Sequence, residues 1–408
     1  MKIRSITFFL NPEWPLKENK FSQAGEFIQN AQAAYEDAGY EVQTTRLATI
    51  PFPLLFKGLK HKQIIQAATS LEKAAIAQSF AYTCLGPALI DQPESYTLVP
   101  ELIEATETLF CCAEMATQKQ GVSLPAVRAC AEVIHKITPL DPNGFANLYF
   151  TALANVDPGS PFFPAAYHQG DQPQFALATE AASLAVDAFA QAESLNEGIR
   201  NLIASIEEHG EKIKKVAKEL TKKFNIPFGG IDFSLAPFPD EASSIGTAFE
   251  RIGVPAVGRH GSLAAAAIIA DALDRANFER IGFSGLFLPL LEDSTLAARA
   301  AEKALTVKDL LMYSAVCGTG LDTVPLPGDC SPEEITALLL DLAALALRLD
   351  KPLTARLMPI PDKKAGEMTS FDFPYFANSR VMVLDAKPLG RHLAGDESFY
   401  LRTRQQRS

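Results

Sequence analysis

The sequence predicts an α/β fold built on a largely parallel sheet. In the first half of the chain, short apolar runs rich in β-branched and aromatic residues alternate with alanine-rich stretches whose apolar residues recur at helical spacing. Strands that alternate with helices are typical of parallel sheets, because the chain must cross over between two parallel strands. No low-complexity linker or short repeat divides the 408 residues, so we expect a single domain over residues 1–408.

The first half shows this alternation most clearly. The first strand is expected over residues 4–10 and the first helix over 21–37, where Gly39 stops the helix. The next expected elements are a strand over 40–47, a helix over 62–78, a strand over 80–85, helices over 100–117 and 124–137, and a strand over 145–154. In this interpretation Cys111 and Cys112 belong to the apolar core of the helix over 100–117 and point in different directions.

The second half opens with an irregular stretch over 155–173 that is rich in proline, glycine and aspartate. An amphipathic helix is expected over 195–224, and we expect it to project from the domain. Ser331 begins a further helix with a capping box, and the residues from 395 onward are expected to form a loose tail. The remaining expected elements are a strand-to-helix run from Gln174, strands over 226–236 and 281–290, and helices over 243–252, 262–276, 295–305 and 307–316.

Composition and charge count against several classes of partner. The net charge is −11 and 21% of the residues are charged, a soluble composition without the basic patches that bind nucleic acids or anionic membranes. The N-terminus begins a strand directly, and no apolar run is long enough to span a bilayer. The six cysteines show no CxxC spacing. We therefore expect reduced thiols, a cytoplasmic location, and neither a nucleic-acid nor a membrane partner.

The strongest site candidates lie in a loop over residues 317–329, which contains three glycines, two prolines, a thiol and two carboxylates. Cys317 is a candidate nucleophile, or else a small buried hydrophobe at a helix end. Asp322 is a candidate general base or metal ligand, or it accepts amide hydrogens from its own turn. Thr319, which lies between two of the glycines, is a candidate substrate contact.

Two further carboxylates stand at the ends of predicted strands. Asp232 interrupts an apolar strand, and a buried carboxylate is costly unless it is paired. Glu292 follows a strand at the position where α/β barrels carry their chemistry, whereas the neighbouring Asp293 is better explained as a helix N-cap. The candidate partners of Asp232 are the basic residues Arg259, His260, Lys363 and Lys364.

His168 lies in the long irregular stretch, and long loops inside compact domains are often functional. It is a candidate proton shuttle or metal ligand, or else it anchors the loop by a hydrogen bond. Arg259 and His260 precede an alanine-rich helix whose N-terminal amides are able to bind an anion. Lys363 and Lys364 form a basic turn that either binds an anionic group or is only solvated. A divalent metal is a candidate cofactor, although no zinc signature, GxSxG elbow or GxGxxG fingerprint is present.

Five segments together resemble an uncharacterised family, domain of unknown function 711: residues 230–237, 261–266, 288–293, 317–329 and 359–367. That family is grouped with the pyruvate formate-lyase-like barrels, so the resemblance implies a barrel of about ten strands surrounded by helices. The glycyl radical enzymes with this barrel carry a glycine in an Arg-Val-x-Gly-aromatic context near the C-terminus. The corresponding segment here, Arg380-Val381-Met382-Val383-Leu384, has no such glycine, so glycyl radical catalysis is not expected.

These features favour an enzyme that acts on a small anionic metabolite inside the barrel. Asp232, Glu292 and Asp322 would supply acid/base or metal contacts beside Cys317, and the basic residues named above would hold the anionic group. The alternative is a non-catalytic metabolite-binding or regulatory protein that keeps the barrel cavity. A third interpretation is an assembly protein whose helix over 195–224 forms the interface of a homo-oligomer.

Overall fold

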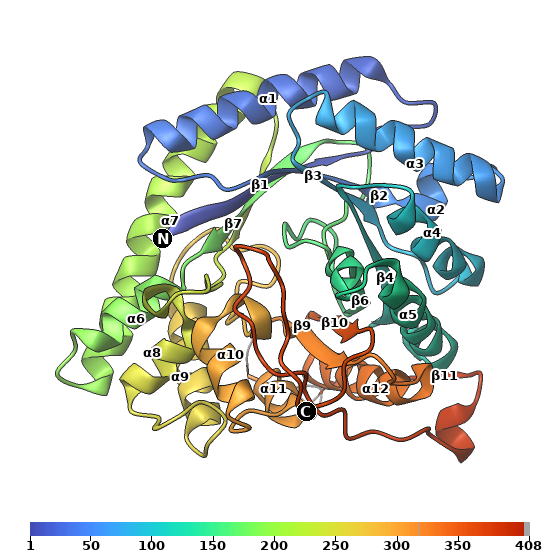
Figure 1. The fold of residues 1–408 in the computed structure, drawn as a ribbon. Helices are drawn as coiled ribbons and strands as arrows, with labels where there is room; N and C mark the ends of the chain where they lie inside the picture. Colours follow the sequence, from blue (N-terminus) through green and yellow to red (C-terminus); the bar gives the residue numbers. More distant parts are fainter. Residues whose placement is uncertain (317, 404–408) are drawn as a thin grey trace.

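The computed structural model describes residues 1–316 and 318–403, and these form a mixed α/β structure around one curved sheet of eleven strands (Figure 1). Nine strands follow one another in the order β8-β7-β1-β2-β3-β4-β6-β10-β9, and the short β5 and β11 extend the sheet from β4. Their bounds are β1 (Lys2–Leu10), β2 (Thr45–Pro51), β3 (Tyr82–Gly86), β4 (Leu109–Thr117), β5 (Gly121–Ser123), β6 (Phe150–Ala154), β7 (Gln174–Glu180), β8 (Phe228–Asp232), β9 (Gly320–Pro327), β10 (Leu353–Ile360) and β11 (Ser398–Phe399).

The sheet has two groups of strands that run in opposite directions. β1, β2, β3, β4 and β6 are parallel to one another. β7 pairs antiparallel with β1, and β10 antiparallel with β6, so β7 and β8 on one side and β10 and β9 on the other run the opposite way. Residues 280–289 form isolated bridges with both edge strands: Arg280 pairs with Ile231 on β8, and Pro289 pairs with Asp322 on β9.

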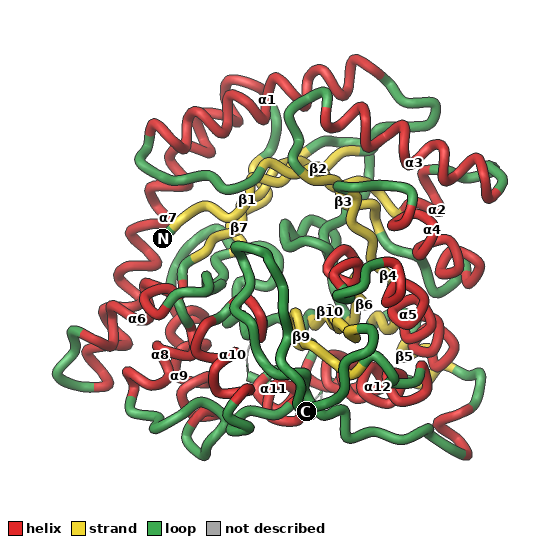
Figure 2. The backbone as a smooth tube through the Cα atoms, in the orientation of Figure 1, coloured by secondary structure: helices red, strands yellow, loops and turns green. Residues whose placement is uncertain are grey.

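Helices form a layer outside the curved sheet (Figures 1 and 2). Their bounds are α1 (Glu18–Asp37), α2 (Phe52–Leu55), α3 (His61–Ile76), α4 (Val99–Glu104), α5 (Leu124–Ile137), α6 (Ala182–Ala190), α7 (Leu195–Phe224), α8 (Ile245–Ile252), α9 (Ser262–Arg275), α10 (Ser294–Ala301), α11 (Val307–Tyr313) and α12 (Pro332–Leu349). The long α7, expected to project, lies in this outer layer, because its buried face, with Leu202, Ile206 and Ile213, packs against α1, α6 and α9. No helix among the described residues is both long and apolar enough to cross a membrane.

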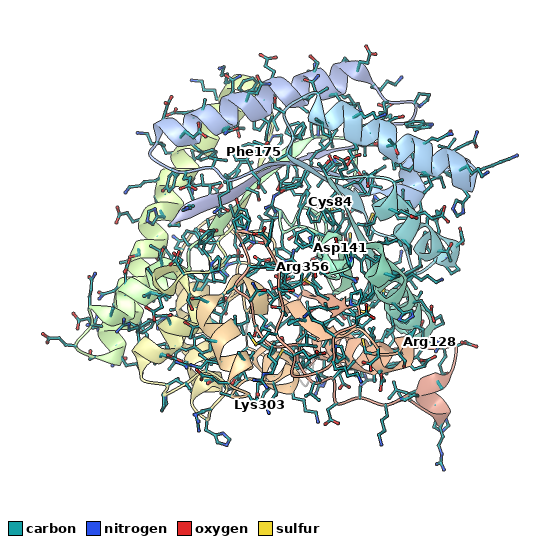
Figure 3. All side chains as sticks on the ribbon, in the orientation of Figure 1. Cys84, Arg128, Asp141, Phe175, Lys303 and Arg356 are labelled. Carbon is teal, nitrogen blue, oxygen red and sulfur yellow. The ribbon has the colours of Figure 1, made fainter. Side chains whose placement is uncertain are left out.

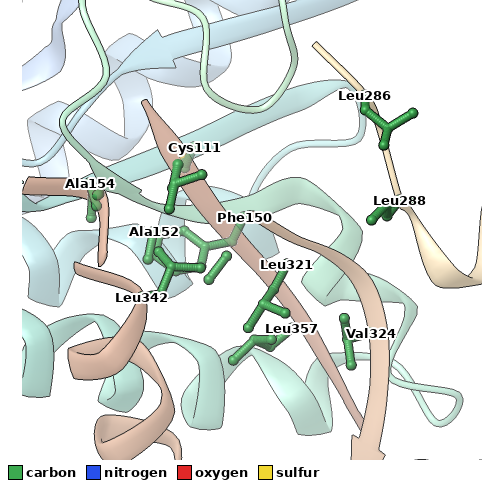
Figure 4. Packing of buried hydrophobic residues seen from close by; sticks show 14 of the residues in the cluster. Cys111, Phe150, Ala152, Ala154, Leu286, Leu288, Leu321, Val324, Leu342 and Leu357 are labelled. Carbon is green, nitrogen blue, oxygen red and sulfur yellow. The ribbon is translucent and has the colours of Figure 1, made fainter. Parts of the chain in front are cut away.

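The strands send side chains both to the helices and to the interior of the sheet. On β1, Ile6 and Phe8 belong to a large apolar cluster under the helices, whereas Phe9 belongs to a separate inner cluster. Figure 4 shows part of the large cluster, where Phe150 of β6 and Leu342 of α12 contribute. Because both faces are buried, such strands appear in the sequence as nearly continuous apolar runs.

The irregular stretch between β6 and β7, residues 155–173, enters the interior of the curved sheet; we call it the inserted loop. Thr7 Oγ1 on β1 donates a hydrogen bond to the Pro161 carbonyl (3.4 Å). The His168 amide donates to the Thr49 carbonyl on β2 (2.9 Å). The aromatic residues of the loop are buried in the inner cluster, so the loop supplies much of the core inside the sheet.

The helix expected over residues 100–117 is wrong in its second half. α4 ends at Glu104, and β4 begins at Leu109. Cys111 of β4 lies in the outer cluster and Cys112 in the inner cluster, and burial raises the pKa of both thiols. A strand that is buried on both faces lacks polar alternation, so periodicity alone does not distinguish it from a buried helix.

Other expectations also differ from the structure. Most of the segment expected as a loop over 317–329 is a strand, β9, and the strand expected over 40–47 lies instead at Thr45–Pro51. Only the second half of the strand expected over 145–154 belongs to β6, because Phe145–Tyr149 form a 3-10 turn. The segment expected as a strand over 281–290 pairs only through isolated bridges. The tail, expected to be loose, is held where Arg128 Nη1 donates to the Gly395 carbonyl (2.7 Å) and where β11 pairs with β5.

Asp293 fixes the start of two helices at once. Its Oδ2 accepts hydrogen bonds from the amides of Ile245 (2.7 Å) and Gly246 (3.2 Å) at the start of α8. Its Oδ1 accepts from the amides of Thr295 (3.0 Å) and Leu296 (2.9 Å) at the start of α10. The N-cap role expected for Asp293 is confirmed, and the same carboxylate also ties α8 to α10.

Replacing Asp293 with alanine should lower the free energy of unfolding by about 2–4 kcal/mol, because it leaves amides of two helices without an acceptor. The control is Ser331→Ala, which removes the cap of α12 only and should cost about 1 kcal/mol. Urea denaturation of the wild type and both variants measures the two losses. Equal losses in the two variants would contradict the double role of Asp293.

Candidate functional site

Three arginines from three different strands converge on one pocket, which we call the arginine pocket. Arg4 comes from β1, Arg46 from β2 and Arg356 from β10. Figure 3 shows Arg356 near the middle of the molecule, whereas the labelled Lys303 lies at its edge. The pocket has a volume of ≈ 90 Å³, and its lining also includes Glu292.

Arg356 is at the centre of a buried chain of ion pairs. Its Nε donates to Asp322 Oδ1 (2.5 Å) and its Nη2 to Glu292 Oε1 (2.8 Å). Arg4 Nη2 donates to the other oxygen of Glu292. Only 5% of the Arg356 and Glu292 side chains and 1% of the Asp322 side chain are exposed. Charges this deeply buried need partners, so the side chains of Asp322, Arg356, Glu292 and Arg4 depend on one another. We call these four residues the ion-pair chain.

The network shifts the pKa values of its two carboxylates in opposite directions. Burial disfavours the charged form of Glu292, but the nearby Arg4, Arg356 and Arg46 outweigh burial and lower its pKa. Burial raises the pKa of Asp322; Arg356 opposes this shift, and the charge of Glu292 adds to it. Glu292 is therefore a charged carboxylate at neutral pH, held between two guanidinium groups.

Arg46 differs from the other two arginines because it has no carboxylate partner among the residues that the structure describes. Its Nε donates to Thr44 Oγ1 (2.8 Å), and its guanidinium lies 5.0 Å from the centroid of the Phe163 ring. Burial, together with repulsion from Arg4 and Arg356, lowers the pKa of Arg46 to about 9, so it is still a cation at neutral pH. Its two terminal nitrogens are available to a ligand.

The structure brings together two of the expected catalytic carboxylates, Glu292 and Asp322, through their shared arginine. Asp232 lies elsewhere in the interior, at the end of β8. Its Oδ1 accepts from the Ser284 amide (2.8 Å) and its Oδ2 from the Phe283 amide (3.0 Å), rather than from any of the basic residues expected as partners. Burial raises the pKa of Asp232 to about 6, although its hydrogen bonds oppose the shift.

His168 and Thr319 are both buried, and neither lines the arginine pocket. The ring nitrogens of His168 and the hydroxyl of Thr319 have no hydrogen-bond partner in the described part of the chain. Burial lowers the pKa of His168 to about 4, so its ring is neutral at pH 7. Cys317, the expected nucleophile, lies outside the described residues.

The basic residues expected to hold an anion lie apart from the arginine pocket. Arg259 and His260 are exposed just before α9, in the outer layer. Lys363 and Lys364 follow β10; Lys364 is exposed, and the Lys363 carbonyl accepts from the Gly328 amide (3.0 Å).

The sequence interpretation missed Arg4, Arg46 and Arg356. The available signal was the one used for Asp232, a charged residue within a run of buried apolar residues. Arg356 gives that signal most clearly, because β10 is buried along its whole length and contains no other charged residue. Across residues 1–316 and 318–403, no group of three or more His, Cys, Asp or Glu side chains is placed to hold a metal ion.

Replacing Glu292 with glutamine should lower the free energy of unfolding by about 3–5 kcal/mol, because Arg4 and Arg356 lose the charge that compensates them in the interior. The control is Glu41→Gln, which removes the partner of the exposed Lys2 and should cost less than about 1 kcal/mol. Chemical denaturation at pH 7 measures both losses. A Glu292 variant as stable as the control would refute the role of the ion-pair chain.

His168 should make the protein less stable at mildly acidic pH. In the unfolded chain a histidine takes up a proton near pH 6.5, whereas the folded protein keeps His168 neutral down to about pH 4. The unfolded state therefore binds more protons in this window, and stability falls as the pH decreases from 6.5 to 4. Between pH 7 and pH 5 this loss is about 2 kcal/mol.

The variant His168→Phe removes the titrating group and keeps a ring beside Phe9. Denaturation curves at both pH values should show that this variant loses about 2 kcal/mol less than the wild type on acidification. The same loss in both proteins would show that His168 does not titrate in this way.

Comparison with known proteins assigns the chain to a family. The family model described as "Uncharacterised ACR (DUF711)" matches residues 1–378, a span that includes every residue of the arginine pocket. The chain is 32% identical over 362 residues to the "UPF0210 protein" of Pyrobaculum islandicum, which covers 85% of this chain and 79% of that relative. "UPF0210 protein" relatives from Oenococcus oeni (29% identical; 86% and 81% covered) and Neisseria gonorrhoeae (26%; 86% and 82%) are also similar. The family resemblance read from the sequence is confirmed, and the chain belongs to the uncharacterised DUF711 family.

Proposed function

We propose that this protein binds a small anionic metabolite in the arginine pocket. The observation that carries the proposal is Arg46, a cation that lines the pocket and has no carboxylate partner among the described residues. Arg46 is partly buried, and a partly buried guanidinium gains free energy when an anion pairs with it. Its planar fork of N–H donors matches the oxygens of a carboxylate or a phosphate group.

The ion-pair chain supports this role because it fixes the other two arginines. Glu292 accepts one hydrogen bond from Arg4 and one from Arg356, and Asp322 accepts one more from Arg356. Each arginine makes these bonds with only part of its guanidinium and also lines the pocket. Donors that are fixed before the ligand arrives lose less conformational entropy on binding. In this proposal Glu292 and Asp322 act as positioning residues.

We further infer that the curved sheet is a barrel of the kind expected from the pyruvate formate-lyase-like resemblance. Residues 280–289 would be the tenth strand, and their isolated bridges to both β8 and β9 support this. The arginine pocket would then lie inside the barrel at one end, with the inserted loop filling the space behind it. Barrels of this size commonly hold either packed side chains or one small ligand.

Catalysis on the bound anion is a second candidate, favoured by the pair Glu292 and Tyr82. The Tyr82 hydroxyl has no hydrogen-bond partner in the described chain and lines the pocket beside the charged Glu292, whose lowered pKa makes it a weak base. A proton-transfer reaction needs a base and an acid within reach of one bound substrate. A binding or regulatory protein needs only the arginines.

Small anions such as acetate and inorganic phosphate should raise the melting temperature of the wild type, because a ligand that binds only the folded state stabilises it. Arg46→Gln should weaken this binding by about 10- to 100-fold, since a hydrogen bond to a charged group contributes about 1.5–3 kcal/mol. The control is Arg259→Gln, which changes an exposed arginine outside the pocket and should bind like the wild type. Scanning calorimetry and titration calorimetry measure these effects.

An anion response that is equal in all three proteins would contradict the proposed site. Chemical analysis of the bound anion separates the two candidates. A product that forms with the wild type and not with Tyr82→Phe assigns catalysis, whereas an unchanged anion favours a binding or regulatory protein.

A further inference from the structure

Aromatic rings form much of the remaining wall of the arginine pocket. Tyr82, Phe110 and Phe163 line it from the sheet and the inserted loop, and Phe373 and Tyr375 line it from the C-terminal region. Five of the twelve lining residues are therefore aromatic, and only Glu292 among them is acidic. Aromatic walls gain free energy by covering flat apolar surface, which a small inorganic anion does not offer.

The inner rings form a continuous surface beside Arg46. The ring centroids of Tyr82 and Phe110 are 5.3 Å apart, and those of Phe110 and Phe163 are 5.6 Å apart, both in edge-to-face arrangements. Phe163 also stacks with the Arg46 guanidinium. The cation and the apolar wall are thus in direct contact, so one ligand is able to touch both.

The outer rings are carried by residues 366–381, which we call the strap. In Figures 1 and 2 the strap is part of the long loop that rises from the C-terminal region toward β7. The Gly366 amide donates to the Val381 carbonyl (2.9 Å), which joins the two ends of the strap. Phe373 and Tyr375 lie near its tip, with ring centroids 5.3 Å apart.

The strap is fixed to the segment that carries Glu292. The Ala377 amide donates to the carbonyl of Leu291, the residue before Glu292 (2.6 Å). Ser379 Oγ donates to the Ala297 carbonyl on α10 (2.7 Å). The strap rings and Glu292 are therefore positioned by the same piece of backbone. The wall is in place before a ligand binds, which lowers the entropy cost of binding.

The fixed charges of the pocket favour an anion with a single charge. Three arginines carry positive charges and two carboxylates carry negative charges, which leaves one net positive charge: Arg4, Arg46 and Arg356 against Glu292 and Asp322. This balance counts the three pocket arginines and the carboxylates paired with them; farther out, Lys2 is paired with Glu41, and Glu180 accepts a hydrogen bond from Gln43. A carboxylate neutralises the group, whereas a phosphate dianion would leave an excess negative charge away from bulk water.

We propose that the ligand is a small monocarboxylate with a flat apolar group. Its carboxylate is bound by Arg46, and its apolar group lies between the inner rings, Phe110 and Phe163, and the strap rings, Phe373 and Tyr375. The pocket is small, with a volume of ≈ 90 Å³, so a ligand with a single ring is the one we test. This inference rests on the proposed function and names the class of ligand for the same pocket.

Titration calorimetry with acetate, benzoate, inorganic phosphate and the neutral benzamide tests this proposal. Benzoate should bind at least about tenfold more tightly than acetate, because its ring is removed from water. It should also bind more tightly than phosphate and benzamide, since these lack either the apolar ring or the negative charge. Arg46→Gln should weaken the binding of both acetate and benzoate.

Tyr375→Ala removes part of the outer wall at a residue that is 38% exposed, and Phe373→Leu removes a ring while keeping an apolar side chain. Both should reduce the advantage of benzoate over acetate. Tyr400→Ala, at a 69% exposed tyrosine that does not line the pocket, is the matched control and should keep the full advantage.

The outcomes separate this inference from the proposed function. If acetate or phosphate binds in an Arg46-dependent manner and benzoate binds no more tightly than acetate, the ligand class is overturned and the anion site stands. If benzoate keeps its advantage in both wall variants, the placement of its ring is overturned. If Arg46→Gln changes the binding of none of the anions, both proposals fall.

Discussion

The ion-pair chain Asp322–Arg356–Glu292–Arg4 is the constraint on which the inside of this protein depends. It connects β9, β10, the 3-10 turn Leu290–Glu292 and β1, which come from opposite ends of the chain. Buried ion pairs generally add little net stability over apolar residues of the same volume. In this protein the ion pairs fix the relative positions of the four segments, because each charge needs its partner close by. The walls of the arginine pocket follow from that arrangement.

The inserted loop also contacts the arginines of the pocket, from the interior of the curved sheet. A curved sheet of this size leaves an interior that must be filled, because empty space forfeits dispersion contacts. The loop fills it with Phe162 and Phe163, whose rings lie 5.8 Å from the Arg356 guanidinium and 5.0 Å from that of Arg46. Phe163 also lines the arginine pocket, so the loop contributes both to the core and to one wall of the pocket. This explains how a long irregular segment is ordered within the fold.

Local features of the fold could be predicted from the sequence, and contacts between distant residues could not. The N-cap role of Asp293 was predictable because its amide partners are two and three residues away, whereas its bonds to α8 reach back 48 and 47 residues. β4 was misread because both of its faces are buried. The same limit applies to the site: a charged residue within a buried strand marks Arg356, but nothing in the spacing reveals that it meets Glu292 and Arg4.

The net charge of the whole chain affects how an anion would reach the arginine pocket. With a net charge of −11, the protein does not attract anions from a distance, and physiological salt screens its surface charges beyond about 8 Å. In the proposed function, an anion gains its binding energy only after it reaches the arginines, beside the aromatic rings that line the pocket. Under these conditions negative charge alone would distinguish poorly between ligands, because the net negative charge of the protein acts in the same way on every approaching anion. In this proposal the pocket discriminates among anions through the rest of the ligand, which contacts the aromatic rings beside Arg46.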